Sequence, residues 1–356
     1  MSHTASDLGA RHRGSAIARN RLPKWTPLAI AAGAVVVGIG IGAGAGLDSH
    51  VQWGLIALIL FVAGNYVVTR VADGPRQAKD RVATSLVYAC FILAIIPLYS
   101  LIETTIAKGV KVLDGNFLGH SMSGVLGTQP GGGVYHAIIG TLEQVGIATV
   151  IAVPIGVFTA IYLVEYGKGA LAKAITFFVD VMTGIPSIVA GLFILSFWIL
   201  ILGFGFSGFA GALALTILMM PIIVRSTEEM LKLVPNELRE ASYALGVPKW
   251  RTIVSIVVPT SIGGIITGVV LAIARIAGET APVLLLVFGS QVINNDPFEG
   301  PQSSLPFYIY EQYNLGNPAA YDRAWAAALV LIILVMILNL IARGIARWKA
   351  PKTSGR

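Results

Sequence analysis

Two oppositely charged side chains stand four residues apart in an otherwise apolar part of this sequence. On a continuous helix, Arg275 and Glu279 would lie on one face. A guanidinium group presents its N–H donors in a planar fork that fits the oxygens of an oxyanion. The carboxylate could hold that fork until an anion displaces it. We therefore predict that this pair lines a path for an anionic solute; the alternative is a salt bridge that only joins two helices.

The elements that must position this pair are membrane spans. Of the 356 residues, 55% are hydrophobic and 12% are charged, and the mean hydropathy is +0.78. Proteins that cross a membrane several times have this composition, and soluble domains of this size do not. The net charge of +7 does not indicate a nucleic acid partner, because the basic residues gather in short loops and at both ends. We therefore expect an all-α integral membrane protein in a lipid bilayer.

Eight apolar runs are long enough to cross a bilayer, which takes about 20 residues. They lie near 27–47, 51–69, 82–106, 136–164, 177–203, 208–224, 253–275 and 325–346. The first run carries glycine at every second position from Gly38 to Gly46. These overlapping small-xxx-small spacings let helices approach closely. A loosely packed peripheral helix is the alternative.

Basic residues fall mainly on one side of these spans. Eight spans place five segments on the same side, namely 1–26, 70–81, 165–176, 225–252 and the tail from Arg343. Of the 25 Lys and Arg residues, those that lie elsewhere are Lys108, Lys111, Arg275 and Arg323. Because positively charged loops stay in the cytoplasm, we predict that both termini are cytoplasmic, with basic tails over 1–26 and 347–356. The long loops 107–135 and 289–324 then lie outside, where an external partner could bind.

Further charged residues lie near the cytoplasmic ends of spans. Arg225 ends the sixth run beside Glu228 and Glu229. It is a candidate for the inner mouth of the solute path, and a side chain that reaches to the membrane interface is the alternative. Asp180 precedes 183–187, a stretch with Gly and Pro that could break its helix and expose backbone groups to a cavity.

Other chemistries have no motif in this sequence. It contains no G-x-x-x-x-G-K-[ST] phosphate-binding loop, and Gly167-Lys168-Gly169 is no fragment of one. Cys90 is the single cysteine, and potential ligands do not cluster at metal-binding spacing. We therefore expect no catalytic residue, metal or cofactor in this chain. Energy for transport would have to come from another subunit or from an ion gradient.

The cytoplasmic segment 225–252 is polar and helix-forming. Four of its residues follow the i, i+3, i+4, i+7 spacing of one helix face, namely Leu238, Ala241, Ser242 and Leu245. We expect Asn236 to cap its N-terminus, Gly246 to form a left-handed C-cap, and Pro248 to open a second short helix. Such a short helix suits insertion into a groove on another protein. An amphipathic helix lying on the membrane surface is the alternative.

Motif spacing favours the docking interpretation. The pattern Glu240-Ala241-Ser242-x3-Gly246-x9-Ile256-x-Val258-Pro259 resembles the EAA loop of ABC importer permeases, E-A-A-x3-G-x9-I-x-L-P, with Ser and Val in place of Ala and Leu. Segments 233–250, 184–189 and 274–282 further resemble PstA-type permeases of phosphate-specific ABC importers. This resemblance covers roughly residues 82–346, and the first two runs depart from the usual six-span pattern.

The resemblance implies a type I ABC importer permease. Its six-helix core would span 82–346, with a coupling helix at 235–250 and an added transmembrane hairpin at 27–69. Phosphate would pass three residues, namely Arg275, Glu279 and Arg225. An ATPase would dock on Glu240, the polar anchor, together with Ala241, Ser242, Gly246, Leu238 and Leu245.

The resemblance also implies partners and a location. The partners would be a PstC-type permease as the other half of a heterodimer, two PstB-type ATPase subunits that bind ATP and Mg, and a PstS-type phosphate-binding protein outside. The location would be the plasma or inner membrane of a bacterium. Closure of the ATPases would pull on the coupling helix and switch the path between its two sides.

Two other functions stay open from the sequence. A permease for another oxyanion, such as molybdate or sulfate, would share the docking loop but not the 275–282 stretch. A secondary transporter driven by an ion gradient would need no ATPase. It would be expected to have inverted repeats and half-helices, which the sequence does not display.

Overall fold

The computed structural model describes residues 22–23, 25–47 and 50–349. This described part is helical, apart from loops and one isolated bridge between Phe288 and Gln302. The tail predicted over 1–26 lies almost wholly outside the described residues, as does most of the tail over 347–356. The chain divides into two compact units, Met1–Ile102 and Glu103–Arg356. That division falls inside a helix, and the domain limits inferred from the sequence stay a prediction.

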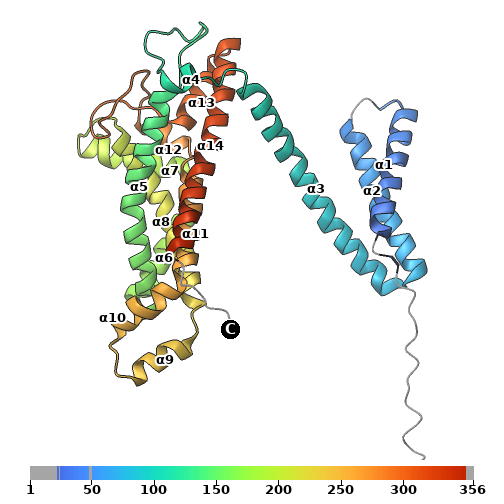
Figure 1. The fold of residues 1–356 in the computed structure, drawn as a ribbon, viewed down its shortest axis with the longest axis horizontal. Helices are drawn as coiled ribbons and strands as arrows, with labels where there is room; N and C mark the ends of the chain where they lie inside the picture. The colour runs from blue at the N-terminus through green and yellow to red at the C-terminus, as the bar shows by residue number, and fades with distance from the viewer. Residues whose placement is uncertain (1–21, 24, 48–49, 350–356) are drawn as a thin grey trace, which may run out of the picture. The chain divides into compact units, whose positions relative to one another are not determined.

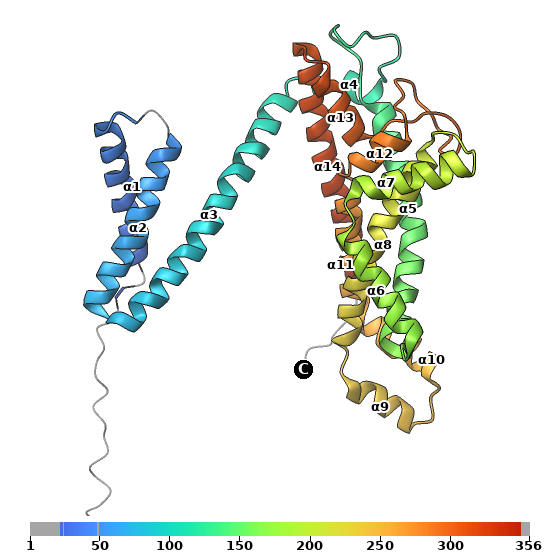
Figure 2. The ribbon, with the colours of Figure 1, turned by 180° about the vertical axis from the view of Figure 1, so that it is seen from behind.

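The first unit contains a hairpin of two apolar helices. Helices α1 (Thr26–Gly44) and α2 (His50–Ala72) lie side by side (Figures 1 and 2). The buried residues of α1 are small and four positions apart, namely Ala34, Gly38 and Gly42. A Cβ atom on Gly38 would lie 2.9 Å from the Cβ of Ala57, so only glycine allows this approach. The small-xxx-small packing is confirmed, and α1 is not loosely packed.

The second unit is a bundle built around one buried helix. Its long helices are α5 (Tyr135–Ile161), α8 (Gly208–Lys232), α11 (Val258–Ile276) and α14 (Pro318–Lys349), and α3 (Pro75–Gly109) runs through both units. Helix α5 continues into a π-helical segment, η1 (Tyr162–Tyr166). Helix α11 is preceded by α10 (Lys249–Thr252) and the π-helical η3 (Ile253–Val257). Helix α8 packs against both α5 and α11.

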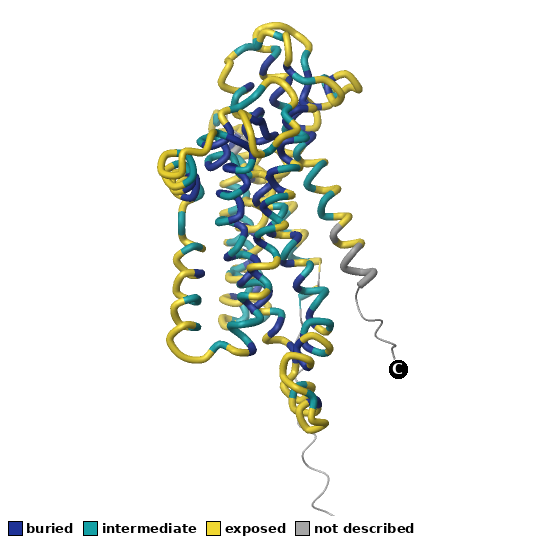
Figure 3. The backbone as a smooth tube through the Cα atoms, turned by 90° about the vertical axis from the view of Figure 1, so that its left-hand side faces the viewer, coloured by how far each residue is buried: buried dark blue, intermediate teal, exposed yellow. Residues whose placement is uncertain are grey.

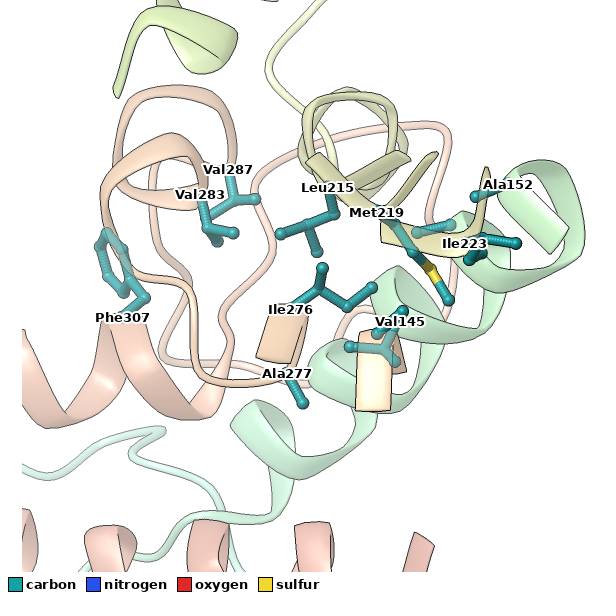
Figure 4. Packing of buried hydrophobic residues seen from close by; sticks show 12 residues of the cluster. Val145, Ala152, Leu215, Met219, Ile223, Ile276, Ala277, Val283, Val287 and Phe307 are labelled. Atoms are coloured by element: carbon teal, nitrogen blue, oxygen red, sulfur yellow. The ribbon is translucent and has the colours of Figure 1, made fainter. Parts of the chain in front are cut away.

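Small residues allow α8 to pack closely against its neighbours. A Cβ atom on Gly156 of α5 would lie 2.8 Å from Cγ2 of Ile223 on α8. In the apolar core, Leu215 of α8 points toward Ile276 of α11, and Met219 belongs to the same cluster (Figure 4). Buried positions follow the inner sides of the bundle helices, and exposed positions follow the outer sides (Figure 3). This arrangement suits a bundle whose outer surface faces lipid or other subunits.

One predicted span is sharply broken. Helix α6 (Ala170–Gly184) meets α7 (Ser187–Ile194) and the π-helical η2 (Leu195–Ile201) at an angle of 108°. Ile185 is extended, with ψ 127°, because the following proline disfavours helical backbone and donates no hydrogen bond. The run over 177–203 is therefore a bent helix pair and not one continuous helix, and the predicted helix break at 183–187 is confirmed.

The other predicted spans agree with the structure. Seven helices in the described residues are long and apolar enough to cross a membrane, and the bent pair would make eight if it counts as one span. The seven remaining apolar runs each overlap one of these helices. The expectation of an all-α protein with multiple spans is therefore confirmed.

The two ends of the bundle carry different structures. One end is covered by α4 (Gly115–Gly119), α12 (Ala281–Leu286) and α13 (Leu305–Asn314), together with the loops between them (Figure 1). Buried apolar side chains such as Phe117 form a separate core there. At the opposite end, α9 (Asn236–Ala244) projects beyond the long helices. The candidate coupling segment is therefore held away from the main core.

Candidate coupling insert and solute path

The projecting helix α9 has sharply defined ends. Asn236 is its first helical residue, and Pro235 occupies the N-cap position with ψ 140°. The prediction that Asn236 caps the helix was wrong, since the extended proline ends the preceding segment one residue earlier. At the other end Gly246 has φ +76°, and its N–H donates to the carbonyl of Tyr243 at 2.9 Å. The left-handed C-cap is confirmed, and Pro248 directly precedes α10 as expected.

The side chains that α9 presents differ in part from expectation. Leu238 is 42% exposed and Leu245 is 84% exposed. Glu240, Ala241 and Gly246 are exposed as well. Ser242, in contrast, is only 4% exposed, and its hydroxyl lies 2.8 Å from that of Thr252 in α10. Its predicted place on the open face was wrong, because the turn at Gly246 folds α10 back over this edge of α9.

A buried ion pair fixes α9 to the end of the α5 span. Arg239 donates from Nε and Nη2 to Oε1 of Glu165 in η1, at 3.0 and 2.8 Å. The two side chains are 12% and 5% exposed. Arg239 also donates to the carbonyls of Leu231 and Val234, at 3.0 and 2.6 Å, where α8 ends. One guanidinium therefore joins α9 to two long helices.

A second cation of the insert reaches the same place. Lys249 of α10 donates to the backbone carbonyl of Glu165, and its Nζ lies 4.9 Å from the ring centroid of Tyr166. Sequence reasoning missed both Glu165 and Arg239 as functional residues. The available signal was an acid at the end of an apolar run and an arginine next to the docking motif, since charges in such positions need partners.

The predicted inner-mouth residue lies in a charge network. Arg225 of α8 pairs with Asp180 of α6, and donates to Oε2 of Glu228 at 2.7 Å. Lys232 completes the series with a 2.6 Å bond to Oε1 of Glu228. Arg225 thus links α6, just before its break, to α8. Both the inner-mouth role of Arg225 and the alternative of a side chain that reaches to the membrane interface stay predictions.

The charged pair with which the sequence analysis began lies at the end of α11. On one continuous helix Arg275 and Glu279 would lie on the same face, but α11 ends at Ile276, so the two residues do not share a helix. The turn that follows still brings them together, with Nη2 of Arg275 3.6 Å from Oε1 of Glu279. The Arg275 side chain is 67% exposed, and that of Glu279 is 18% exposed. The guanidinium is therefore exposed on this chain, and the carboxylate is largely buried.

The outer end contains a buried arginine that sequence reasoning also missed. Arg323 of α14 donates to Oε1 of Gln312 at 2.7 Å. It further donates to three loop carbonyls, those of Gly127, Gln129 and Gly131, at 2.5, 2.7 and 3.2 Å. Nearby, burial raises the pKa of Tyr308, so its hydroxyl stays protonated. The 127–131 loop is therefore fastened to α13 and α14.

A many-span helical bundle with a short polar helix held out at one end is an architecture that suits a membrane transport permease. In the described residues, no group of three or more His, Cys, Asp or Glu side chains could hold a metal ion. Residues 152–355 match the family model of the binding-protein-dependent transport system inner membrane component. The chain belongs to this family, and within it to the PstA phosphate transport permeases.

Relatives named as PstA permeases are similar in sequence to this chain over most of its length. The phosphate transport system permease protein PstA 1 of Mycobacterium tuberculosis (strain CDC 1551 / Oshkosh) is 53% identical over 277 residues, which are 78% of this chain and 91% of the relative. The PstA protein of Mycobacterium leprae is 49% identical over 290 residues, 81% of this chain and 95% of the relative. PstA of Yersinia pestis is 41% identical over 276 residues, 75% of this chain and 90% of the relative.

A solved structure agrees with the fold. A chain of a bacterial alginate ABC transporter has a TM-score of 0.56, covers 76% of this chain and is covered over 96% of its own length. Its sequence identity is 16%, so it supports the ABC permease fold alone.

Proposed function

We propose that this chain is the membrane-spanning permease subunit of an ATP-driven importer of inorganic phosphate. The observation that carries the proposal is the 53% identity to a phosphate transport permease along 91% of that relative. The charged groups of the bundle agree with an anionic solute, because an accessible guanidinium lies at the end of α11. The protein is then half of a translocation path and not itself an enzyme.

In this proposal, helix α9 transmits the conformational changes of the ATPase to the membrane spans. A separate ATPase of the PstB type, with its ATP and Mg, docks on the exposed side chains of α9, chiefly Glu240, Ala241, Leu238 and Leu245. Exposed leucines on a projecting helix support this, since a short helix with apolar anchors fits a groove on a partner. Gly246 supplies the turn, and buried Ser242 holds the two short helices together.

Two further partners complete the proposed importer. A PstC-type permease supplies the other half of the path, and a PstS-type protein delivers phosphate to the outer end. The ordered outer loops support the second of these contacts, because Arg323 holds part of their backbone in place. The chain then lies in a bacterial cell membrane with both termini in the cytoplasm.

Phosphate passes the charged residues of the bundle in this scheme. Arg275 offers its fork to phosphate oxygens, and Glu279 competes for the same donors, which keeps binding weak enough for release. Arg225 sits near the inner end, within the ion-pair network that joins α6 and α8. ATP-driven movement of α9 rocks the spans, and this switches the access of the path from one side to the other.

Reconstitution of the full complex tests the proposal. Vesicles that contain the chain with its three partner types should accumulate phosphate when ATP is supplied, and sulfate or molybdate in excess should compete poorly. Vesicles with this chain alone should accumulate none. Deletion of 237–246 should abolish uptake while the protein still inserts. Accumulation by the chain alone, or equal competition by sulfate, would overturn the proposal.

A further inference from the structure

Helix α9 is joined to the spans by chain segments that break helical geometry on both sides. On its N-terminal side lies Pro235, in extended conformation, and on its C-terminal side lies Gly246, with φ +76°. Neither connection continues a helix, so neither transmits a push or a pull as a rigid rod does. A partner that moves α9 shifts the bundle only if another, stiffer connection exists.

Side-chain bonds provide that connection. Ser242 of α9 is hydrogen-bonded to Thr252 of α10, and two further bonds meet at Glu165. Arg239 and Lys249 both donate to Glu165, the first to its carboxylate and the second to its backbone carbonyl. The Arg239 fork also holds the carbonyls of Leu231 and Val234. Because the ion pair is shielded from water, its charges are screened less than those of a surface pair. A planar guanidinium with several fixed acceptors resists displacement in more than one direction.

Through its position at the end of α5, Glu165 connects α9 to the core of the bundle. It lies in η1, the π-helical end of α5, and α5 packs along α8 through close contacts such as Gly156 with Ile223. A shift of Glu165 therefore moves the end of a span that is locked into the core. Short π-helical segments occur often at functional sites.

We propose that Arg239 and Glu165 form the strut through which α9 moves the spans. They are positioning residues for transport, and they neither touch the solute nor form the ATPase contact. This inference rests on the proposed coupling of α9 to an ATPase. It predicts that loss of the pair uncouples ATP hydrolysis from uptake and leaves docking intact.

The test uses the complete reconstituted importer with Arg239→Gln, Glu165→Gln and the double variant. ATPase co-purification and the rate of ATP hydrolysis should stay within about twofold of the unmodified complex, while phosphate taken up per ATP hydrolysed falls about tenfold in each single variant. The double variant should be no worse than either single one, because the pair acts as a unit. Arg239→Lys, which keeps the charge without the fork, should give an intermediate loss.

The matched control is Arg251→Gln, which removes an exposed arginine of α10 and should leave the ratio unchanged. Uptake per ATP within twofold of normal in the single variants would overturn the strut, and so would additive losses in the double variant. Loss of ATPase co-purification in Arg239→Gln would overturn it as well, since the pair would then serve docking. Absence of phosphate uptake by the unmodified complex would contradict the proposed function instead.

A distance measurement tests the strut without any transport assay. Spin labels at Ala244→Cys of α9 and Lys168→Cys, next to η1, are placed in a Cys90→Ser background, since both positions are exposed. With the strut intact, the distance between the labels should change by less than about 2 Å between the nucleotide-free and ATP-bound complexes. In Arg239→Gln it should change by about 5 Å. Equal changes in both proteins would overturn the inference.

Discussion

The role of an arginine in this protein depends on how far its side chain is buried and on which acceptors surround it. Arg323 is 2% exposed and is surrounded by acceptors, so it can only hold structure together. Arg275 is largely exposed and has one carboxylate at 3.6 Å, so its donors stay accessible to an anion. Desolvation decides between these roles, because a buried cation needs all its partners whereas a half-solvated one can exchange them.

Replacement of Arg275 tests its part in the path. Arg275→Ala should lower the rate of phosphate uptake about tenfold or more, because a hydrogen bond to a charged group contributes about 1.5–3 kcal/mol. Arg275→Lys should lower it less, since the charge is kept without the fork. Uptake by the reconstituted complex is the measurement, and Lys173→Ala, at an exposed position of α6, is the control. Normal uptake by both Arg275 variants would show that the pair is only structural.

The turn at Gly246 offers a second test at this scale. Gly246→Ala should weaken ATPase co-purification about tenfold, because a side chain in the left-handed region costs about 1–2 kcal/mol. The strain would be relieved by unwinding the end of α9, which displaces Leu245 from the docking face. Gly263→Ala in α11 is the matched control, since a Cβ atom there meets nothing within 4 Å. Unchanged binding in Gly246→Ala would mean that the turn does not position the docking face.

At the scale of elements, side chains from distant segments decide where helices and loops are held. The break between α6 and α7 is local, but Asp180, just before it, is tied to α8 by Arg225. The long outer loops are likewise fastened from a distance: Gln302 donates to Glu143 of α5 at 2.5 Å and accepts from Gln144 at 2.9 Å. These loops therefore present a formed surface at the outer end.

The Arg323 clamp predicts a local change in loop stability. Arg323→Lys should speed amide hydrogen exchange at Gln129 about a hundredfold, since the loss of charged hydrogen bonds costs about 3 kcal/mol and opens the loop locally. The amide of Leu215, in the buried part of α8, should exchange at its normal rate. Mass spectrometry of the detergent-solubilised protein provides the measurement. Equal exchange at Gln129 in both proteins would contradict a clamp.

At the scale of the whole molecule, the distribution of basic residues along the chain predicts its orientation in the membrane. Basic residues cluster beside α9, and the opposite end of the bundle carries the loops that Arg323 holds. In the proposed function, the solute therefore arrives at the end that carries these loops, and the ATPase docks at the end that carries α9. This separation is what a coupled importer requires, since solute arrives on one side and ATP is hydrolysed on the other.

Cysteine labelling tests this orientation. In a Cys90→Ser background, a membrane-impermeant maleimide should label Ala244→Cys only from the cytoplasmic side and Ser123→Cys only from the outside. Both positions are exposed in the structure, and the positive-inside rule assigns their sides. Lys168→Cys serves as a second cytoplasmic control. Labelling of Ser123→Cys and Ala244→Cys from the same side would contradict the proposed topology.

The sequence by itself determined the class of protein, the places of most of its spans and the short polar helix with its glycine turn. These follow from local properties: an apolar run needs a certain length to cross a bilayer, and Gly246 adopts a backbone conformation that other residues avoid. The bend at Ile185 was also foreseeable, although its angle of 108° was not.

Only the tertiary structure decided which side chains are buried between these elements and which partners they bind. Ser242 is buried because α10 folds back on α9. Arg239 is paired with the carboxylate of Glu165, which lies 74 residues earlier in the chain. Arg323 reached carbonyls almost 200 positions away, as its bond to Gly127 illustrates with a separation of 196 residues. Periodicity places a side chain on a face of its own helix. What that face meets depends on how the bundle folds, and so the burial and pairing of charges appear only in three dimensions.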